Sequence, residues 1–295
     1  MTLPTFLGIG VPRAGTTWLH TLLAAHPDVY LPTRRKEVRF FDRHHDQGQA
    51  WYEEFFCDPD EARRFAAIGE ISPQYLYCDE CPGRISALLP RAKLIVMLRH
   101  PVDRAYSQFG FVIQRRDFRG SFAEFVASRN RALEMGFYSR HLERYLNHFE
   151  RSQILPMIFE EAVSERSQVR QELARFLGVS EELFPKTTDR VNPSTVPRFR
   201  TLSSAAVKTG RRLRRHHLES LVDLAGRMGL RRLMTSGRRV PALDQELKRN
   251  LSEMFADEFE ALESSWGLDL SIWRDPASVP TRPAAPRNAE SRGSA

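Results

Sequence analysis

The chain has 295 residues, which is enough for one large α/β domain or two small ones. With 41% hydrophobic and 27% charged residues it has the composition of a globular protein, and no apolar run approaches the roughly 20 residues of a membrane-spanning helix. The net charge of +7 predicts an anionic partner, which nucleic acid, an acidic membrane surface or a polyanionic nucleotide would equally satisfy.

Short apolar runs alternate with amphipathic stretches along the chain, as strands and helices do in βαβ units. The expected strands cover residues 6–10, 93–98 and 154–159. The expected helices cover residues 16–25, 140–149, 164–177 and 243–266, and a further helix opens at Pro101. The sequence therefore predicts an α/β fold, a P-loop-type three-layer α/β/α domain with a central parallel sheet.

Composition divides the chain into a domain and a tail. Residues 1–274 are expected to form the domain, with a basic helical subregion at about 201–240. Residues 275–295 are rich in Pro, Ala, Arg and Ser and lack apolar periodicity, so we expect them to be disordered. The first residues lack the basic region and apolar core of a secretory signal, and a cytoplasmic location is expected.

Three cysteines, an odd number, argue against a disulfide framework. Cys78 and Cys81 have the CxxC spacing of redox and zinc sites, but no second ligand pair accompanies them. We interpret them as reduced thiols near a turn, and the sequence predicts no metal site.

A phosphate-binding loop is predicted at residues 8–17, Gly-Ile-Gly-Val-Pro-Arg-Ala-Gly-Thr-Thr, between an expected strand and an expected helix. Small residues let the backbone amides point inward, and the helix adds the positive end of its dipole. The spacing from Gly10 to Gly15 matches GxxxxGK[ST]. However, Thr16 stands at the lysine position, and the cation is Arg13 instead.

The strand at 93–98 ends in Arg99, where a magnesium-dependent P-loop enzyme would carry a carboxylate. A cation at this place suits a second phosphate group and not a metal. The ligand would then be a nucleotide with phosphates at two separated positions. A magnesium-dependent P-loop kinase and a non-catalytic basic binding protein are the alternatives from the residues alone.

Several segments resemble the sulfotransferases that use 3′-phosphoadenosine 5′-phosphosulfate (PAPS), and most closely the heparan sulfate branch and its bacterial relatives. Val11-Pro-Arg-Ala-Gly-Thr-Thr17 is similar to the 5′-phosphosulfate loop, and residues 98–107 are similar to the 3′-phosphate motif. Residues 24–31, 36–42, 69–75 and 136–142 also fit the branch, so the similarity covers roughly residues 5–180. The resemblance implies transfer of a sulfuryl group from PAPS to a hydroxyl, or less favourably an amine, of a carbohydrate, small-molecule or lipid acceptor.

The resemblance also implies roles for individual residues. Glu37 would be the general base, and Arg13 would neutralise charge on the departing phosphate. The late loop at residues 192–200 resembles a segment that folds over the nucleotide. The implied cofactor-binding residues are Arg13, Ala14, Gly15, Thr16, Thr17, Trp18, Arg99, Ser107 and Arg198.

Two lysines common in the branch are absent from this chain. Arg13 replaces the lysine of the loop, and a guanidinium can still clamp phosphate oxygens. Ile71 stands where many relatives have the lysine of Glu-Lys-Thr-Pro. Either Arg13 or another cation such as Arg39 would then have to act in its place.

Other polar residues compete with Glu37 or assist it. His100 adjoins Arg99 and is expected to face away, while His26 is expected at a helix end. The pair at residues 44–45 could approach an acceptor, and Asp42 could orient either an acceptor or Arg39. The basic clusters at residues 208–217 and 227–239 are either a solvated helical face or a contact for an anionic membrane or carrier surface; no nucleic-acid partner is expected.

Overall fold

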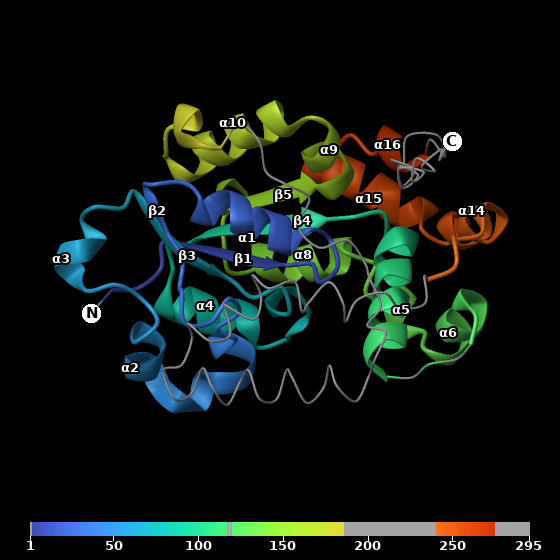
Figure 1. Ribbon diagram of the computed structural model, residues 1–295, viewed down its shortest axis with the longest axis horizontal. Coiled ribbons are helices and arrows are strands. Elements are labelled where there is room, and N and C mark those ends of the chain that lie inside the picture. Colours follow the sequence, from blue (N-terminus) through green and yellow to red (C-terminus); the bar gives the residue numbers. More distant parts are fainter. Residues whose placement is uncertain (1, 117, 119, 186–239, 275–295) are drawn as a thin grey trace, which may run out of the picture.

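The computed structural model describes residues 2–116, 118, 120–185 and 240–274. Its centre is a five-stranded sheet in the order β2-β3-β1-β4-β5, and every strand pair is parallel (Figure 1). The strands are β1 (Phe6–Gly10), β2 (Val29–Tyr30), β3 (Ala67–Ile71), β4 (Lys93–Leu98) and β5 (Ile154–Ile158). The predicted parallel sheet is confirmed.

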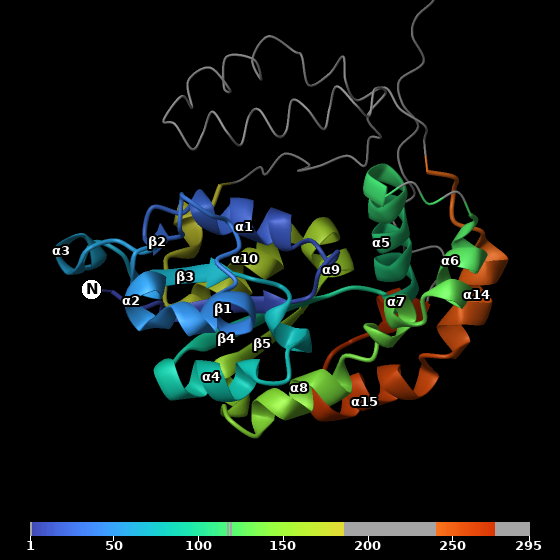
Figure 2. The ribbon, with the colours of Figure 1, turned by 90° about the horizontal axis from the view of Figure 1, so that it is seen from below.

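Helices cover both faces of this sheet (Figures 1 and 2). Helices α1 (Thr16–Ala24) and α10 (Arg166–Leu177) lie on one face, and α4 (Cys81–Leu88) and α8 (Ser139–Leu146) lie on the other. The remaining α-helices are α2 (Gly48–Glu53), α3 (Pro59–Ala62), α5 (Pro101–Arg116), α6 (Phe122–Ser128), α7 (Arg131–Glu134), α9 (Phe159–Ser164), α14 (Gln245–Glu253), α15 (Ala256–Trp266) and α16 (Ser271–Arg274). The three-layer architecture agrees with the prediction.

The central strands are apolar on both sides because helices cover both faces. Strands β1 and β3 are buried at every position, and β4 is buried at every position after Lys93. Continuous apolar runs of this kind are typical of parallel sheets. Sequence patterning missed β3, whose Gly69 and Glu70 are poor strand formers. A Cβ at Gly69 would lie 2.5 Å from the Phe6 ring, so close packing against β1 requires glycine there.

The single helix expected over residues 243–266 is wrong, because the chain breaks into α14 and α15. The Asp244 side chain caps α14 by accepting from two backbone amides. Phe255 lies in the break and is completely buried, with its ring centre 4.8 Å from that of Phe137. Helix α14 contacts α5, whereas α15 contacts α8, so the break lets one amphipathic segment follow two different partners (Figure 2).

Several expectations fall outside the described residues: the basic subregion at 201–240, both basic clusters, Arg198 and the tail at 275–295. Within the described part of the chain, no helix combines the length and the apolar character needed to cross a membrane.

Candidate active site

The two predicted phosphate motifs meet at the carboxyl end of the sheet. Strands β1 and β4 are parallel neighbours, so the segments that follow them leave the sheet side by side. The Val11 amide donates to the Met97 carbonyl at 2.9 Å, and a guanidinium nitrogen of Arg99 donates to the Arg13 carbonyl at 3.1 Å. Arg99 therefore holds the backbone of the first loop directly.

The loop turns sharply before α1. Arg13 and Gly15 have positive φ angles of 75° and 85°, in the left-handed region. No side chain caps the first turn of α1, and its first turn contains no acidic residue. The amides and the positive dipole end of this helix can therefore serve an anion that approaches the loop.

Arg99 is fixed by side chains that the sequence analysis did not identify. Its guanidinium carbon lies 4.9 Å from the centre of the Phe159 ring, and its Nε lies 4.0 Å from Oε1 of Glu160. The hydroxyl of Tyr138 donates to the Arg99 carbonyl at 2.7 Å. Phe159 also fills the space beside Gly15, where a Cβ would come within 2.3 Å of the ring. The position of Phe159 and Glu160 just after β5, at the same sheet edge, was the available signal.

Arg13 reaches across to the second motif. Its Nε donates to the Ser107 hydroxyl at 3.2 Å, and its guanidinium carbon lies 4.9 Å from the centre of the Phe111 ring. The structure thus brings together Arg13, Arg99 and Ser107, as the predicted donor site requires. The guanidinium of Arg13 is directed toward α5, the helix of the 3′-phosphate motif.

Glu37 is partly buried, and it lies in a segment that contacts the first turn of α1. The residue before it, Lys36, donates from Nζ to the Thr17 hydroxyl at 2.7 Å. The residue after it, Val38, donates its amide to Oε2 of Glu70 at 3.2 Å. The segment carrying Glu37 is therefore attached to α1 on one side and to the sheet on the other.

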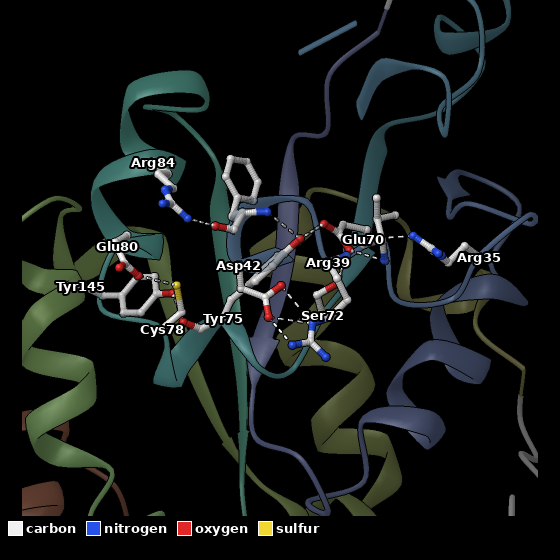
Figure 3. Close-up of polar contacts among 12 residues, drawn as sticks. Arg35, Arg39, Asp42, Glu70, Ser72, Tyr75, Cys78, Glu80, Arg84 and Tyr145 are labelled. Atoms are coloured by element: carbon white, nitrogen blue, oxygen red, sulfur yellow. Dashed lines mark hydrogen bonds and ion pairs between the residues drawn. The ribbon is translucent and has the colours of Figure 1, made fainter. Parts of the chain in front are cut away.

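Glu70 is a completely buried carboxylate that organises this segment (Figure 3). Besides the Val38 amide, it accepts hydrogen bonds from the hydroxyls of Ser72 at 2.6 Å, Tyr75 at 2.6 Å and Tyr52 at 3.2 Å. Burial raises the pKa of Glu70, and these donors oppose the rise. Sequence analysis placed Glu70 in a family motif but gave it no role.

Replacing Glu70 with glutamine is expected to destabilise the protein by about 1–3 kcal/mol, because an amide NH₂ would face a donor and leave it unsatisfied in the interior. The result would be measured by urea unfolding. Tyr52→Phe is the control, because it removes one donor and leaves the carboxylate intact. Equal stability of Glu70→Gln and wild type would show that the network does not hold the segment.

Ile71 stands at the position of the missing lysine, and Arg39 was considered as the cation that replaces this lysine. Ile71 is fully buried, and a Cβ at Gly8 would lie 2.8 Å from its side chain, so Ile71 packs against β1. Arg39 donates from Nε to both carboxylate oxygens of Asp42, at 2.9 and 2.8 Å (Figure 3). The contact of Asp42 with Arg39, one of the two considered from the sequence, is present in the structure.

The four histidines considered from the sequence make contacts of their own. His100 is buried, its Nε2 lies 3.3 Å from the Ser252 hydroxyl, and burial lowers its pKa to about 4. His26 lies just after α1, and its Nε2 is 2.8 Å from the Ser180 carbonyl. His44 and His45 pack on Trp51 and Phe40, with ring centres 5.0 and 5.4 Å apart. His100 thus faces away from the loop and His26 lies at a helix end, as expected.

The cysteines Cys57, Cys78 and Cys81 are free thiols. A hydrogen bond with Cys81 lowers the pKa of Cys78. Among the described residues, no group of three or more His, Cys, Asp or Glu side chains is arranged to hold a metal ion.

The parallel sheet, the glycine-containing loop before α1 and the arginine after β4 define an α/β protein with a P-loop-type phosphate loop. The family model described as "Sulfotransferase domain" matches residues 3–261. The chain therefore belongs to the sulfotransferase family and is an enzyme of that class, which replaces the kinase and non-catalytic alternatives.

Relatives of known name support this assignment. The chain is 34% identical over 197 residues to the mouse protein named bifunctional heparan sulfate N-deacetylase/N-sulfotransferase 4, covering 60% of this chain and 22% of the relative. It is 35% identical over 187 residues to mouse heparan sulfate glucosamine 3-O-sulfotransferase 3A1, covering 60% of this chain and 46% of the relative. The alignment thus spans less than half the length of these relatives.

The chain is also similar to a solved structure. The sulfotransferase from Alicyclobacillus acidocaldarius is 26% identical, with a TM-score of 0.62, and the match covers 93% of this chain and 100% of that one. The fold of the central sheet and its helices is therefore that of a sulfotransferase.

Proposed function

We propose that this enzyme transfers the sulfuryl group of PAPS to a hydroxyl of a carbohydrate acceptor. The observation that carries the proposal is the junction of the two phosphate motifs, where Arg13 donates to Ser107 and Arg99 donates to the Arg13 carbonyl. A ligand with phosphates at two separated positions suits such a junction, and PAPS is a nucleotide of this kind.

The donor would be held by two groups of residues. The amides from Ala14 to Trp18 and the hydroxyls of Thr16 and Thr17 would surround the 5′-phosphosulfate, aided by the α1 dipole. Arg99 and Ser107 would hold the 3′-phosphate, and charge-assisted hydrogen bonds of this type are short and strong. Arg198, outside the described residues, is proposed as a further contact to the nucleotide.

The reaction would proceed by in-line displacement. The acceptor oxygen attacks sulfur, and its proton passes to the Glu37 carboxylate. The bond between sulfur and the bridging oxygen breaks, and its electron pair remains on the 5′-phosphate of 3′-phosphoadenosine 5′-phosphate (PAP). Arg13, together with the loop amides, would neutralise the charge that develops on this phosphate.

A carbohydrate acceptor is supported by the relatives whose names refer to heparan sulfate. These names include both N- and 3-O-sulfotransferases. Acceptor assays should therefore compare glycans that have only hydroxyl groups with glycans that also have free amines. The basic cluster at residues 208–217, outside the described residues, is proposed as a contact for an anionic acceptor, membrane or carrier surface.

The donor is tested by thermal-shift titration of the wild-type enzyme with PAP, with ADP, and with ATP plus magnesium. At a PAP concentration 100 times Kd, stabilisation of about 2.7 kcal/mol is expected. The shift should be strongest for PAP and should diminish in Arg99→Ala and in Ser107→Ala, the milder change. Equal stabilisation by ATP with magnesium, and indifference to the 3′-phosphate, would refute the proposed donor.

A further inference from the structure

The cations around the loop are not equivalent. Arg39 is neutralised by Asp42, and Arg13 is directed to Ser107 on α5. Ile71 provides no charge and packs against β1. A cation close to the first turn of α1, where the sulfuryl group of the proposed donor would lie, therefore has to come from another residue.

Lys36 occupies this place. Its ammonium donates to the Thr17 hydroxyl at 2.7 Å, and Thr17 is the second residue of α1. The side chain is partly buried, and no carboxylate oxygen among the described residues lies within 4.0 Å of its Nζ. A partly buried ammonium at the positive end of a helix dipole is electrostatically unfavourable unless an anion joins it.

The surroundings of Lys36 bear out this excess of positive charge. His20 lies one turn along α1, and its pKa is lowered to about 4, first by burial and second by the charge of Lys36. Burial also lowers the pKa of Lys36, while the charge of Glu37 opposes the change. His20 is therefore neutral near pH 7, and the charge of Lys36, added to the positive end of the α1 dipole, favours a bound anion.

We propose that Lys36 binds the sulfonate oxygens of PAPS and holds the sulfuryl group in line during transfer. It would thereby replace the lysine that many relatives have at the position of Ile71. This inference rests on the proposed function. The sulfur–oxygen bond to the 5′-phosphate breaks while the acceptor oxygen bonds to sulfur, and Lys36 gives up no proton. The adjacent Glu37 receives the acceptor proton, so consecutive residues would supply the cation and the base.

The inference makes a prediction that does not depend on the acceptor. PAP lacks the sulfonate, so loss of the ammonium should weaken PAPS binding and leave PAP binding nearly unchanged. Lys36→Met is expected to lower PAPS affinity roughly 10- to 100-fold, the range for a hydrogen bond to a charged group. Lys36→Arg should retain most of the affinity. The kcat for transfer to a glycan should fall in Lys36→Met by about 10²–10³-fold.

The measurement is a thermal-shift titration of each variant with PAPS and with PAP. Arg34→Met is the matched control, because it removes an exposed cation two residues away that donates a hydrogen bond to the Glu54 carbonyl. Lys36→Gln replaces Lys36→Met should the latter fail to fold. Parallel weakening of PAPS and PAP, or no change in either, would refute the role of Lys36. Failure of the wild type to bind PAP would instead refute the proposed donor.

Discussion

Replacing Glu37 with glutamine is expected to lower kcat roughly 10²–10⁴-fold, the usual contribution of a positioned general base. The glutamine keeps the size of the side chain but cannot accept the proton of the acceptor hydroxyl. Among the described residues, no hydrogen bond or ion pair joins the Glu37 carboxylate to the loop; its neighbours make the contacts, Lys36 with Thr17 and Val38 with Glu70. PAP affinity should therefore remain within about twofold of wild type, because PAP contains neither the sulfuryl group nor the acceptor on which the proposed base acts.

The experiment compares initial rates of transfer from PAPS to a glycan with PAP binding in the same preparations. Glu54→Gln is the control, because Glu54 is an exposed acidic residue of the neighbouring segment. Full activity of Glu37→Gln would exclude it as the base. Attention would then move to His44 and His45, which lie on the same stretch of chain.

Replacing Gly15 with alanine is expected to destabilise the protein by about 2–5 kcal/mol and to abolish measurable PAP binding. Two causes add. The φ of 85° is unfavourable for a residue with a Cβ, and that Cβ would lie 2.3 Å from the Phe159 ring. Displacement of Phe159 would in turn move Arg99, which lies over its ring.

Two variants separate these causes in urea unfolding and PAP titration. Gly178 has a similar φ of 78°, but its Cβ would meet nothing within 4 Å, so Gly178→Ala reports the backbone cost alone. The double variant Gly15→Ala/Phe159→Ala removes the ring that the new Cβ would meet and keeps the backbone cost. Equal stability losses in Gly15→Ala and Gly178→Ala would contradict the proposed clash with Phe159.

Local patterns in the sequence predict the elements that surround the loop. Strands β1 and β4 appear at the expected residues, because buried strands are nearly pure apolar runs. Strand β3 was missed because Gly69 and Glu70 serve tertiary contacts: one admits the Phe6 ring, and the other accepts four hydrogen bonds. The break before α15 depends on separate partner helices, which local periodicity does not reveal.

In the candidate site, too, the sequence identifies some residues and only the folded structure reveals others. Arg99 and Ser107 could be identified from their motif, and the structure brings both to the loop through Arg13. Lys36 could not be distinguished from its charged neighbours, because only the folded chain shows that it reaches Thr17. Phe159 was read as the end of a strand, and its contact with Arg99 depends on how β5 pairs with β4.

The direct pairing of β1 with β4 has a further consequence. Neighbouring strands lie about 4.8 Å apart, and the hydrogen bonds of a sheet resist any change in that spacing. The pairing therefore fixes the distance between the loop after β1 and Arg99 after β4, the two places where the proposed donor would bind. The segment that carries Glu37 is attached to these motifs and to the sheet mainly through side chains: Lys36 donates to Thr17, Glu70 accepts from the Val38 amide, and Ser72 accepts from the Arg39 amide. Substitutions in that segment would thus change the acceptor preference and leave the spacing of the two donor-binding motifs unchanged.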